Sequence, residues 1–354
     1  MNTMTFEVKK FSDCNLEDAF FDSLKKDYPD FEYWFNKKSN EGAMSYVAVE
    51  DNATQAFLYV KDRECEAVGD LPASPRMKIG TLKVCEDFGR RRIAEGAIGI
   101  AFWKWQRSEL DEIYITVYPK YDVTIKLLKR FGFVYKGKKG NEDVYFKSKK
   151  ELCYEDPRMS FPYIDPNFST GRYIPIDDVY HDRMFQYSDL KNTQQIRGDF
   201  PVSNGITKNF IATPYSKLEY AIGDVVLIYR KHTGPEPKRY RSVLTSYCVI
   251  TDVTAIKTVG KAFHTFDKFI DIAGNKTVYT AEQLKEIYAR PNVYVIEMIY
   301  NGYFGAGKNI TYNALTEMGL FEGHPYSIKL DRKNVFDILK KGGKSERDII
   351  VDKP

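Results

Sequence analysis

Residues 78–105 read KIGTLKVCEDFGRRRIAEGAIGIAFWKW and decide the fold. The first seven alternate in the manner of a β-strand, with Ile79 and Leu82 as its apolar residues. From about Arg90 onward, apolar residues return at helical spacing, at Ile93, Ala97, Ile98, Ala101 and Phe102. A strand therefore leads through a short loop into a helix N-terminus, where unpaired backbone N–H groups and a partial positive charge can hold a pyrophosphate.

A second signature lies in residues 112–137, EIYITVYPKYDVTIKLLKRFGFVYKG, where a strand at 112–117 precedes a helix that ends near Gly132. Together the two stretches resemble the GCN5-related (GNAT) acyl-coenzyme A transferases. The first motif of that family is a strand ending in Val, then x-Pro-x-x-(Arg/Gln)-Gly-x-Gly-x-(Gly/Ala), and Val84 and Ala94 match it. The second is Asn-x-x-Ala-x-x-Leu-Tyr-x-x-x-Gly-Phe, which is matched by Leu127, Gly132 and Phe133.

The chain also departs from the family pattern. Gly89 stands where Arg or Gln is usual, and Arg90 and Arg92 replace glycines. The N–H groups that would contact phosphate survive any substitution other than proline. Tyr121 and Leu128 take the Asn and Tyr positions of the second motif, so the tyrosine that often protonates the departing thiolate in this family is absent.

The resemblance implies a mixed α/β acyltransferase domain that uses acetyl-coenzyme A as acyl donor. It implies that the backbone near Val84 polarises the thioester carbonyl. The cofactor-binding residues that it implies are Leu82, Val84, Gly89, Arg90, Arg91, Arg92, Ile93 and Ala94. We expect Glu86 to deprotonate an amine, and Tyr118 or Tyr121 to reach the thiolate. Two plainer interpretations stay open: a solvated helix start for the arginines, and an exposed loop carboxylate for Glu86.

Composition limits the classes of protein and site. A chain of 354 residues exceeds the usual size of one domain, so we expect a domain at 1–150, an ordered linker at 151–200 and a second domain at 201–354. No apolar run approaches the roughly 20 residues of a membrane span, so no membrane partner is expected. Five scattered cysteines without C-x-x-C spacing favour a reducing cytoplasm, and the four isolated histidines predict no metal site.

The second half is predominantly β in pattern, which makes the whole chain α+β. The phrase LEYAIGDVVLIYR, residues 218–230, is a turn that feeds a buried strand, and a charged hairpin and a long strand follow it. This half resembles the small β-barrels of the PUA-like superfamily, including the ASCH and EVE groups, which implies a role with RNA or a modified nucleobase. The residues expected to contact nucleic acid are Arg230, Lys231, Lys238, Arg239, Tyr240 and Arg241.

Three functions fit these patterns. The favoured one is an N-acetyltransferase that moves an acetyl group from acetyl-coenzyme A to an amine on RNA or on a nucleic-acid-linked substrate held by the second domain. A transferase for a protein or small amine needs only the chemistry of the first domain. A catalytically impaired regulator that binds coenzyme A or RNA is the third, because motif glycines and a tyrosine are replaced. The acceptor and the oligomeric state do not follow from the sequence.

Overall fold

The computed structural model describes residues 6–85, 91–191, 195, 200–215 and 218–351. Their contacts divide the chain into two compact units, Met1–Glu151 and Leu152–Pro354. We call them the first and the second unit. Among the described residues no helix is long and apolar enough to cross a membrane.

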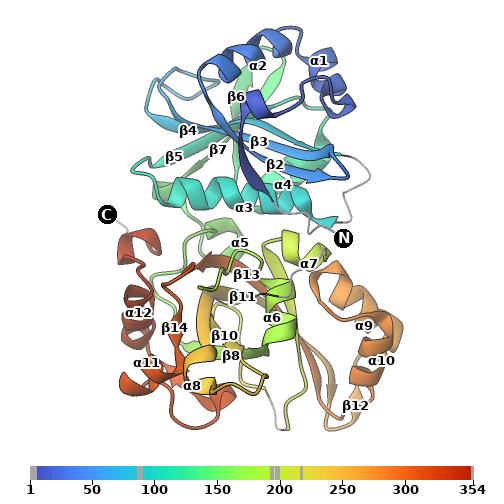
Figure 1. Ribbon diagram of the computed structural model, residues 1–354, viewed down its shortest axis with the longest axis vertical. Helices are drawn as coiled ribbons and strands as arrows, with labels where there is room; N and C mark the ends of the chain where they lie inside the picture. Colours follow the sequence, from blue (N-terminus) through green and yellow to red (C-terminus); the bar gives the residue numbers. More distant parts are fainter. Residues whose placement is uncertain (1–5, 86–90, 192–194, 196–199, 216–217, 352–354) are drawn as a thin grey trace. The chain divides into compact units, whose positions relative to one another are not determined.

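The first unit is built on a seven-stranded sheet (Figure 1). Its order is β1 (Glu7–Lys10), β2 (Met44–Glu50), β3 (Ala53–Glu64), β4 (Arg76–Val84), β5 (Glu112–Val117), β7 (Glu142–Ser148) and β6 (Val134–Lys139). Neighbouring strands are antiparallel except for β4 and β5, which are parallel. A parallel pair needs a crossover connection, and α3 (Ile93–Gln106) supplies it.

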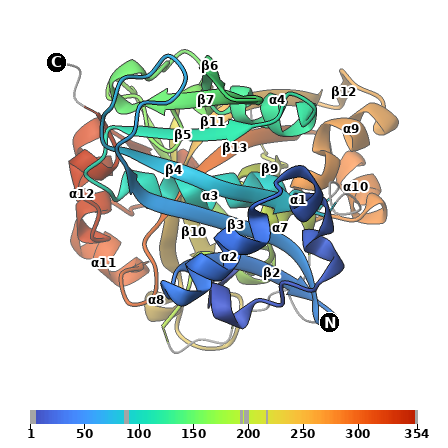
Figure 2. The same cartoon turned by 90° about the horizontal axis from the view of Figure 1, so that it is seen from above.

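Helices cover both faces of this sheet. The helices α1 (Asp22–Asp27) and α2 (Phe31–Asn40) lie on one face of β2 and β3, and α3 lies on the other (Figure 2). The helix α4 (Asp122–Arg130) follows β5, as the second motif predicts. Phe102 of α3 packs against Phe131 and Phe133, the segment that contains the family's Gly-Phe pair, with ring centroids 6.5 and 5.5 Å away.

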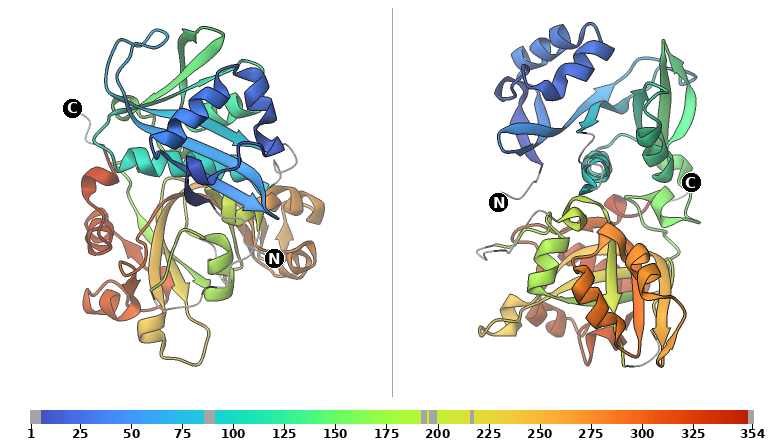
Figure 3. Two further views of the ribbon diagram at one scale, coloured as in Figure 1. Left: turned by 45° about the horizontal axis from the view of Figure 1, so that its top comes forward. Right: turned by 90° about the vertical axis from the view of Figure 1, so that its right-hand side faces the viewer.

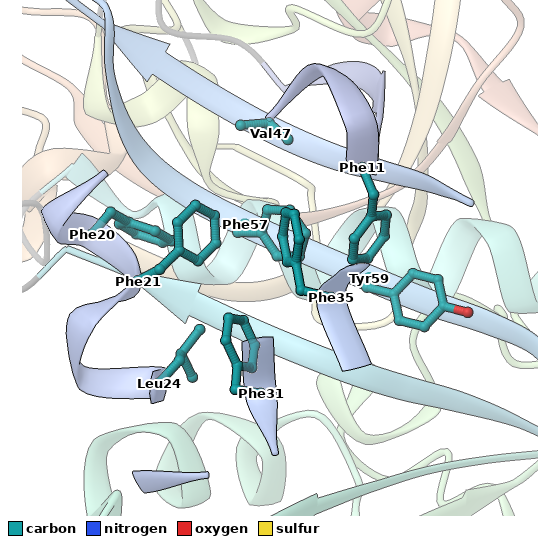
Figure 4. Close-up of a cluster of buried hydrophobic side chains, with 9 residues drawn as sticks. All are labelled: Phe11, Phe20, Phe21, Leu24, Phe31, Phe35, Val47, Phe57 and Tyr59. Atoms are coloured by element: carbon teal, nitrogen blue, oxygen red, sulfur yellow. The ribbon is translucent and has the colours of Figure 1, made fainter. Parts of the chain in front are cut away.

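An aromatic cluster fills the space between α1, α2 and the sheet (Figure 4). Phe11 is its centre, because its ring lies 4.9–5.6 Å from four others, two of them on β3. Edge-to-face pairs of this kind contribute about 0.5–1.5 kcal/mol each beyond area burial. The buried members are Phe11, Phe20, Phe21, Leu24, Phe31, Phe35, Val47, Phe57 and Tyr59.

The second unit has its own sheet, in the order β15 (Lys329–Leu330), β8 (Gly171–Asp177), β10 (Val225–Lys231), β11 (Val243–Thr258), β13 (Val293–Tyr303) and β9 (Thr207–Ala212). Two short strands, β12 (Lys261–Ala262) and β14 (Ile310–Thr311), also pair with β11. β8 and β10 are parallel, whereas the other pairs are antiparallel. The helices are α5 (Pro157–Ser160), α6 (Asp178–Met184), α7 (Pro201–Asn204), α8 (Lys238–Arg241), α9 (Phe266–Ala273), α10 (Ala281–Tyr288), α11 (Tyr312–Glu317) and α12 (Arg332–Lys341).

Helices pack at both ends of the second sheet. Phe269 of α9 and Leu284 of α10 are buried with Ile211 and Val293 of β9 and β13. At the other end α12 crosses β8 so closely that a Cβ at Gly171 would lie 2.2 Å from Cγ2 of Val335. Glycine is therefore required at this helix–strand contact.

One expectation for this half, the closed barrel, is corrected by the structure. Among the described residues the sheet is open, because β15 and β9 lie at its two ends and do not pair, so the expected closed barrel is not found. The expected linker at 151–200 contributes the strand β8 and two helices to the second unit. Pro175 lies in β8 beyond the two residues that pair with β15, where no described strand pairs with that edge, so proline is tolerated.

Candidate active site

The pairing between β4 and β5 stops after three positions, Met77↔Ile113, Lys78↔Tyr114 and Ile79↔Ile115. Beyond Ile79, β4 continues to Val84 and pairs only with β3, while β5 continues to Val117 and pairs only with β7. The two halves of the sheet separate on either side of α3 (Figure 3, right). Among the described residues, the edge of β4 at residues 80–84 that faces away from β3 therefore has no partner strand, although it lies in the interior of a seven-stranded sheet.

A β-bulge lies where the two strands part. Tyr59 pairs with Thr81 and Val60 pairs with Ile79, so Gly80 is the extra residue on β4. A Cβ at Gly80 would lie 2.7 Å from Cδ1 of Tyr59, so a larger residue would collide with that ring. Bulges bend a strand and increase its local twist, and they are frequent beside active sites. This bulge explains why β4 turns away from β5.

The exposure of the β4 residues also increases at the bulge. Met77 and Ile79 are 1% exposed, whereas Gly80 is exposed and residues 81–84 are half-buried. An interior strand normally has both edges satisfied, because a buried N–H or C=O without a partner costs about 1–3 kcal/mol. The open edge of β4 can therefore bind an extended ligand that carries amides, in the way that a peptide adds to a sheet. Leu82 and Val84, both expected at the coenzyme site, lie on it.

The N-terminus of α3 lies downstream of this edge. Arg92 is the N-cap residue, with a left-handed backbone (φ 59°) and no side-chain cap. Its guanidinium Nη2 lies 2.6 Å from Glu95 Oε2, and Arg91 Nη1 lies 2.8 Å from Glu50 Oε1. Carboxylates therefore neutralise both arginine side chains, and what the helix start offers an anion is its backbone N–H groups, at Ile93 and Ala94. The expected Glu86, Gly89 and Arg90 lie outside the described residues.

The two tyrosines expected near the thiolate both contact Asp27 at the end of α1. The hydroxyl of Tyr118 donates to the backbone carbonyl of Asp27 at 3.2 Å, and that of Tyr121 donates to the Asp27 carboxylate. Lys120 also pairs with this carboxylate, at 2.6 Å. Burial and the bond to Asp27 raise the pKa of Tyr121, which makes its hydroxyl a weaker acid than that of an ordinary tyrosine.

The structure adds three residues that the motifs did not indicate. The ring of Tyr28 packs against that of Tyr118 at a tilt, with ring centroids 5.1 Å apart, and its hydroxyl donates to Glu142 Oε1 at 2.8 Å. Lys78 of β4 pairs with Tyr114 of β5, and its ammonium group lies over the ring of Tyr114. It has no ion pair with a described carboxylate. Burial lowers the pKa of Lys78, and the charge of Lys139 lowers it further. Tyr28 and Glu142 are 114 residues apart in the chain, so no local pattern could join them.

The six residues expected to contact nucleic acid divide into two groups. Arg230 is 4% exposed, and its Nε and Nη2 donate to Asp182 at 2.8 and 2.9 Å. Lys231 pairs with Asp177 at 2.8 Å on the surface. The exposed helix α8 contains the other four, Lys238, Arg239, Tyr240 and Arg241.

A buried polar network accounts for Arg230. The Asp182 carboxylate also contacts Nδ1 of His181 at 2.9 Å, and Nε2 of His181 lies 2.8 Å from Oγ1 of Thr245. Burial acts to raise the pKa of Asp182, but hydrogen bonds from Arg230 and His181 outweigh it and hold the pKa well below its usual range. Arg230 therefore has a structural role and is unavailable to phosphate, because its charge is already paired inside the unit.

Comparisons with known proteins were made on the whole chain. No family model matches it, and no curated protein matches it. Solved structures of GNAT acetyltransferases are similar to the N-terminal part of the chain. A GNAT-family acetyltransferase from Bacillus cereus is 17% identical with a TM-score of 0.30, over 41% of this chain and 97% of its own. The PaiA N-acetyltransferase from Thermoplasma acidophilum, in complex with coenzyme A, is 13% identical with a TM-score of 0.31, over 41% and 99%. A GNAT-family acetyltransferase from Staphylococcus aureus is 12% identical with a TM-score of 0.32, over 41% and 99%.

Proposed function

We propose that the first unit transfers an acetyl group from acetyl-coenzyme A to a primary amine. The observation that carries this proposal is the open edge of β4 that begins at the Gly80 bulge. The pantetheine arm of coenzyme A is an extended chain with two amides, so it can satisfy backbone groups along residues 80–84. Backbone N–H groups on the same edge can polarise the thioester carbonyl and stabilise the oxyanion that forms when it is attacked.

The remaining groups of the first unit support the same assignment. The pyrophosphate of coenzyme A is a dianion, and the backbone N–H groups at the start of α3 suit it. The charge at this helix start comes from the peptide dipoles, since Glu95 already pairs with Arg92. The resemblance of the sequence to GNAT motifs assigns the coenzyme to the same strand and helix.

The chemical step forms one bond and breaks another. The amine nitrogen attacks the thioester carbon, a C–N bond forms, the C–S bond breaks, and one proton moves from the nitrogen to the departing thiolate. Glu86 remains our proposed acceptor of the amine proton. Tyr118 is a better donor to the thiolate than Tyr121, because the Tyr121 hydroxyl is bonded to a carboxylate and its pKa is raised.

Hydrogen–deuterium exchange with and without coenzyme A tests the site. We expect slower exchange of amides in residues 80–84 of β4 and in the first turn of α3 when coenzyme A binds. The amides of β10 in the second unit serve as the internal control and should not change. Protection elsewhere with none in 80–84 would remove the assignment. Mass spectrometry of an amine panel incubated with acetyl-coenzyme A then tests transfer, through a gain of one acetyl group.

A second candidate activity concerns α8 of the second unit. We propose that this helix contacts RNA, which would make an RNA-linked amine the acceptor. The supporting observation is that Tyr240 is 61% exposed beside Arg239, with their ring and guanidinium 5.7 Å apart. Cations with an exposed ring can bind phosphate and stack on a base. A gel shift at low and physiological salt, with wild type and a Lys238, Arg239 and Arg241 triple Ala variant, tests it; equal binding by both would exclude α8.

A further inference from the structure

A cavity of about 240 Å³ lies within the second unit. One wall comes from residues 154–169, the other from the turn at 221–224 and from Val249 of β11. It has room for several water molecules or for a small organic molecule. Nothing assigned so far to either unit uses this space.

The charge of the cavity wall is one-sided. Asp165 and Asp224 both line it, and no lysine or arginine is among the described lining residues. Arg172 lies outside the lining, with its Nε 3.3 Å from Oδ2 of Asp224. A ligand would therefore meet carboxylate oxygens and no cation.

The Asp224 carboxylate has one oxygen, Oδ1, that can accept a hydrogen bond from a ligand. The residue is 6% exposed, and both of its side-chain hydrogen bonds, from Ala221 N at 2.9 Å and from Arg172, go to Oδ2. Among the described residues no donor is bonded to Oδ1. Oδ1 can therefore accept a hydrogen bond from an N–H donor that enters the cavity. Burial raises the pKa of Asp224, and a bound cation would oppose this effect.

The rest of the wall suits an organic body rather than a metal ion. Ile164 and Phe168 are buried in it, and Ile222, which is 59% exposed, gives the lining an exposed apolar side chain. Asn167 and Ser169 add exposed amide and hydroxyl groups. Ligand sites in proteins combine an apolar lining with a few polar groups that orient the ligand in this way.

We propose that this cavity binds a small organic cation, an amine or amidine that donates N–H bonds to Asp224 and Asp165 while its apolar body contacts Ile222 and Phe168. The charge of the ligand matters as much as its shape, because a charge-assisted hydrogen bond to a carboxylate is about twice as strong as a neutral one. All residues that line this cavity belong to the second unit, so the proposal for the cavity can be tested independently of acetyl transfer.

Titration calorimetry on the full chain tests the proposal with two probes of nearly equal shape, benzamidine and its uncharged counterpart benzamide. We expect benzamidine to bind in the millimolar range and benzamide at least tenfold more weakly, roughly the value of one charge-assisted bond. Equal affinity for the two probes would overturn the proposal. So would the absence of binding heat with benzamidine at 20 mM, a concentration about ten times the expected Kd.

Variants locate the binding. Asp165→Asn removes a charge at a half-buried position, and Ile222→Arg adds a cation at an exposed one, so both should fold and both should weaken benzamidine about tenfold. Asp271→Asn, an exposed carboxylate on α9, is the matched control and should bind as wild type does. Circular dichroism checks that each variant is folded. Benzamidine affinity that is unchanged in both Asp165→Asn and Ile222→Arg would mean that the cation binds elsewhere, which rejects this cavity.

Discussion

Each of the two sheets contains a parallel pair of strands, and the two pairs differ in length. In the second unit β8 and β10 are paired at seven consecutive positions, from Gly171↔Val225 to Asp177↔Lys231. In the first unit β4 and β5 are paired at three, and a bulge at Gly80 follows immediately. The continuous pair makes a scaffold, because the facing edges of its two strands satisfy each other. Interrupted pairing leaves an edge that a ligand can complete.

The polar side chains beside the two parallel pairs also differ between the units. In the second unit, the Arg230–Asp182 pair and the hydrogen bonds of His181 are enclosed beside the continuous pair of strands. In the first unit, Tyr118 and Tyr121 follow the end of β5, and their hydroxyls contact Asp27. Polar side chains are thus buried with their partners beside one sheet, and tyrosine hydroxyls contact Asp27 beside the other. The comparison can be broken at four points.

The largest expected effect is in the second unit. Arg230→Met leaves the Asp182 carboxylate buried without its strongest partner, and the loss of one member of a buried ion pair costs about 3–5 kcal/mol. Urea unfolding followed by circular dichroism measures this cost. Lys231→Met, next along β10 in an exposed pair with Asp177, is the control and should cost less than about 1 kcal/mol. Similar costs for the two variants would show that burial of the pair is unimportant.

Acid should weaken the second unit through Glu297, which pairs with Arg158 and Lys276. Burial acts to raise the pKa of Glu297, but the two cations outweigh burial and lower it to about 2. The folded pKa lies below the unfolded one, near 4.5. The stabilisation is therefore present above pH 4.5 and is lost as pH falls toward 2, about 3 kcal/mol at most.

Glu297→Gln should remove this pH dependence. The variant should be less stable than wild type at pH 7, and its free energy of unfolding should fall less between pH 4.5 and pH 2. Unfolding at several pH values measures the difference. Glu286→Gln, an exposed position on α10, should follow the wild-type curve. A Glu297→Gln curve parallel to that of the wild type would contradict the assignment.

The first unit is tested at Tyr118. If its hydroxyl protonates the thiolate, Tyr118→Phe should lower turnover about 100-fold and leave coenzyme affinity nearly intact. Tyr121→Phe should retain turnover within a factor of about three and lose mainly its bond to Asp27. Steady-state kinetics with a fixed amine acceptor compare the two. Full activity in both would assign the proton to solvent or to another residue.

The smallest expected effect is at the bulge itself. Gly80→Ala pushes a methyl group against the ring of Tyr59, and overpacking of this kind costs about 1–3 kcal/mol. We expect a less stable protein that also binds coenzyme A more weakly, measured by thermal unfolding and calorimetry. Thr81→Ala, the next residue on β4, adds no atoms and is the control. A stabilised Gly80→Ala variant with wild-type affinity would separate the bulge from the site.

Local pattern predicted the elements whose apolar residues recur at a regular spacing, and missed those that depend on distant partners. The expected strand Glu112–Val117 is confirmed at both ends, and its apolar residues recur at strand spacing. β8 was assigned to a linker because regular periodicity disappears after Glu151 and the segment is rich in Pro, Asp and aromatic residues. The strand depends on its pairing with β10, which lies far away in the sequence. Arg230 was expected on the surface because nearby residues are charged, yet its partner Asp182 lies 48 residues away. The end of pairing between β4 and β5 has no sequence signal of its own.

The aromatic cluster around Phe11 bears on the order in which the protein is made. All nine of its members, from Phe11 to Tyr59, are contained in the first 59 residues, whereas the far half of the same sheet needs residues up to 148. Contacts between residues that are close in sequence form early, and domains fold from the N-terminus during synthesis. A nascent chain can therefore gather this cluster while β5 is still to be translated. The junction of β4 and β5, where the pairing stops, then also separates the part of the sheet that is synthesised first from the part that is synthesised later.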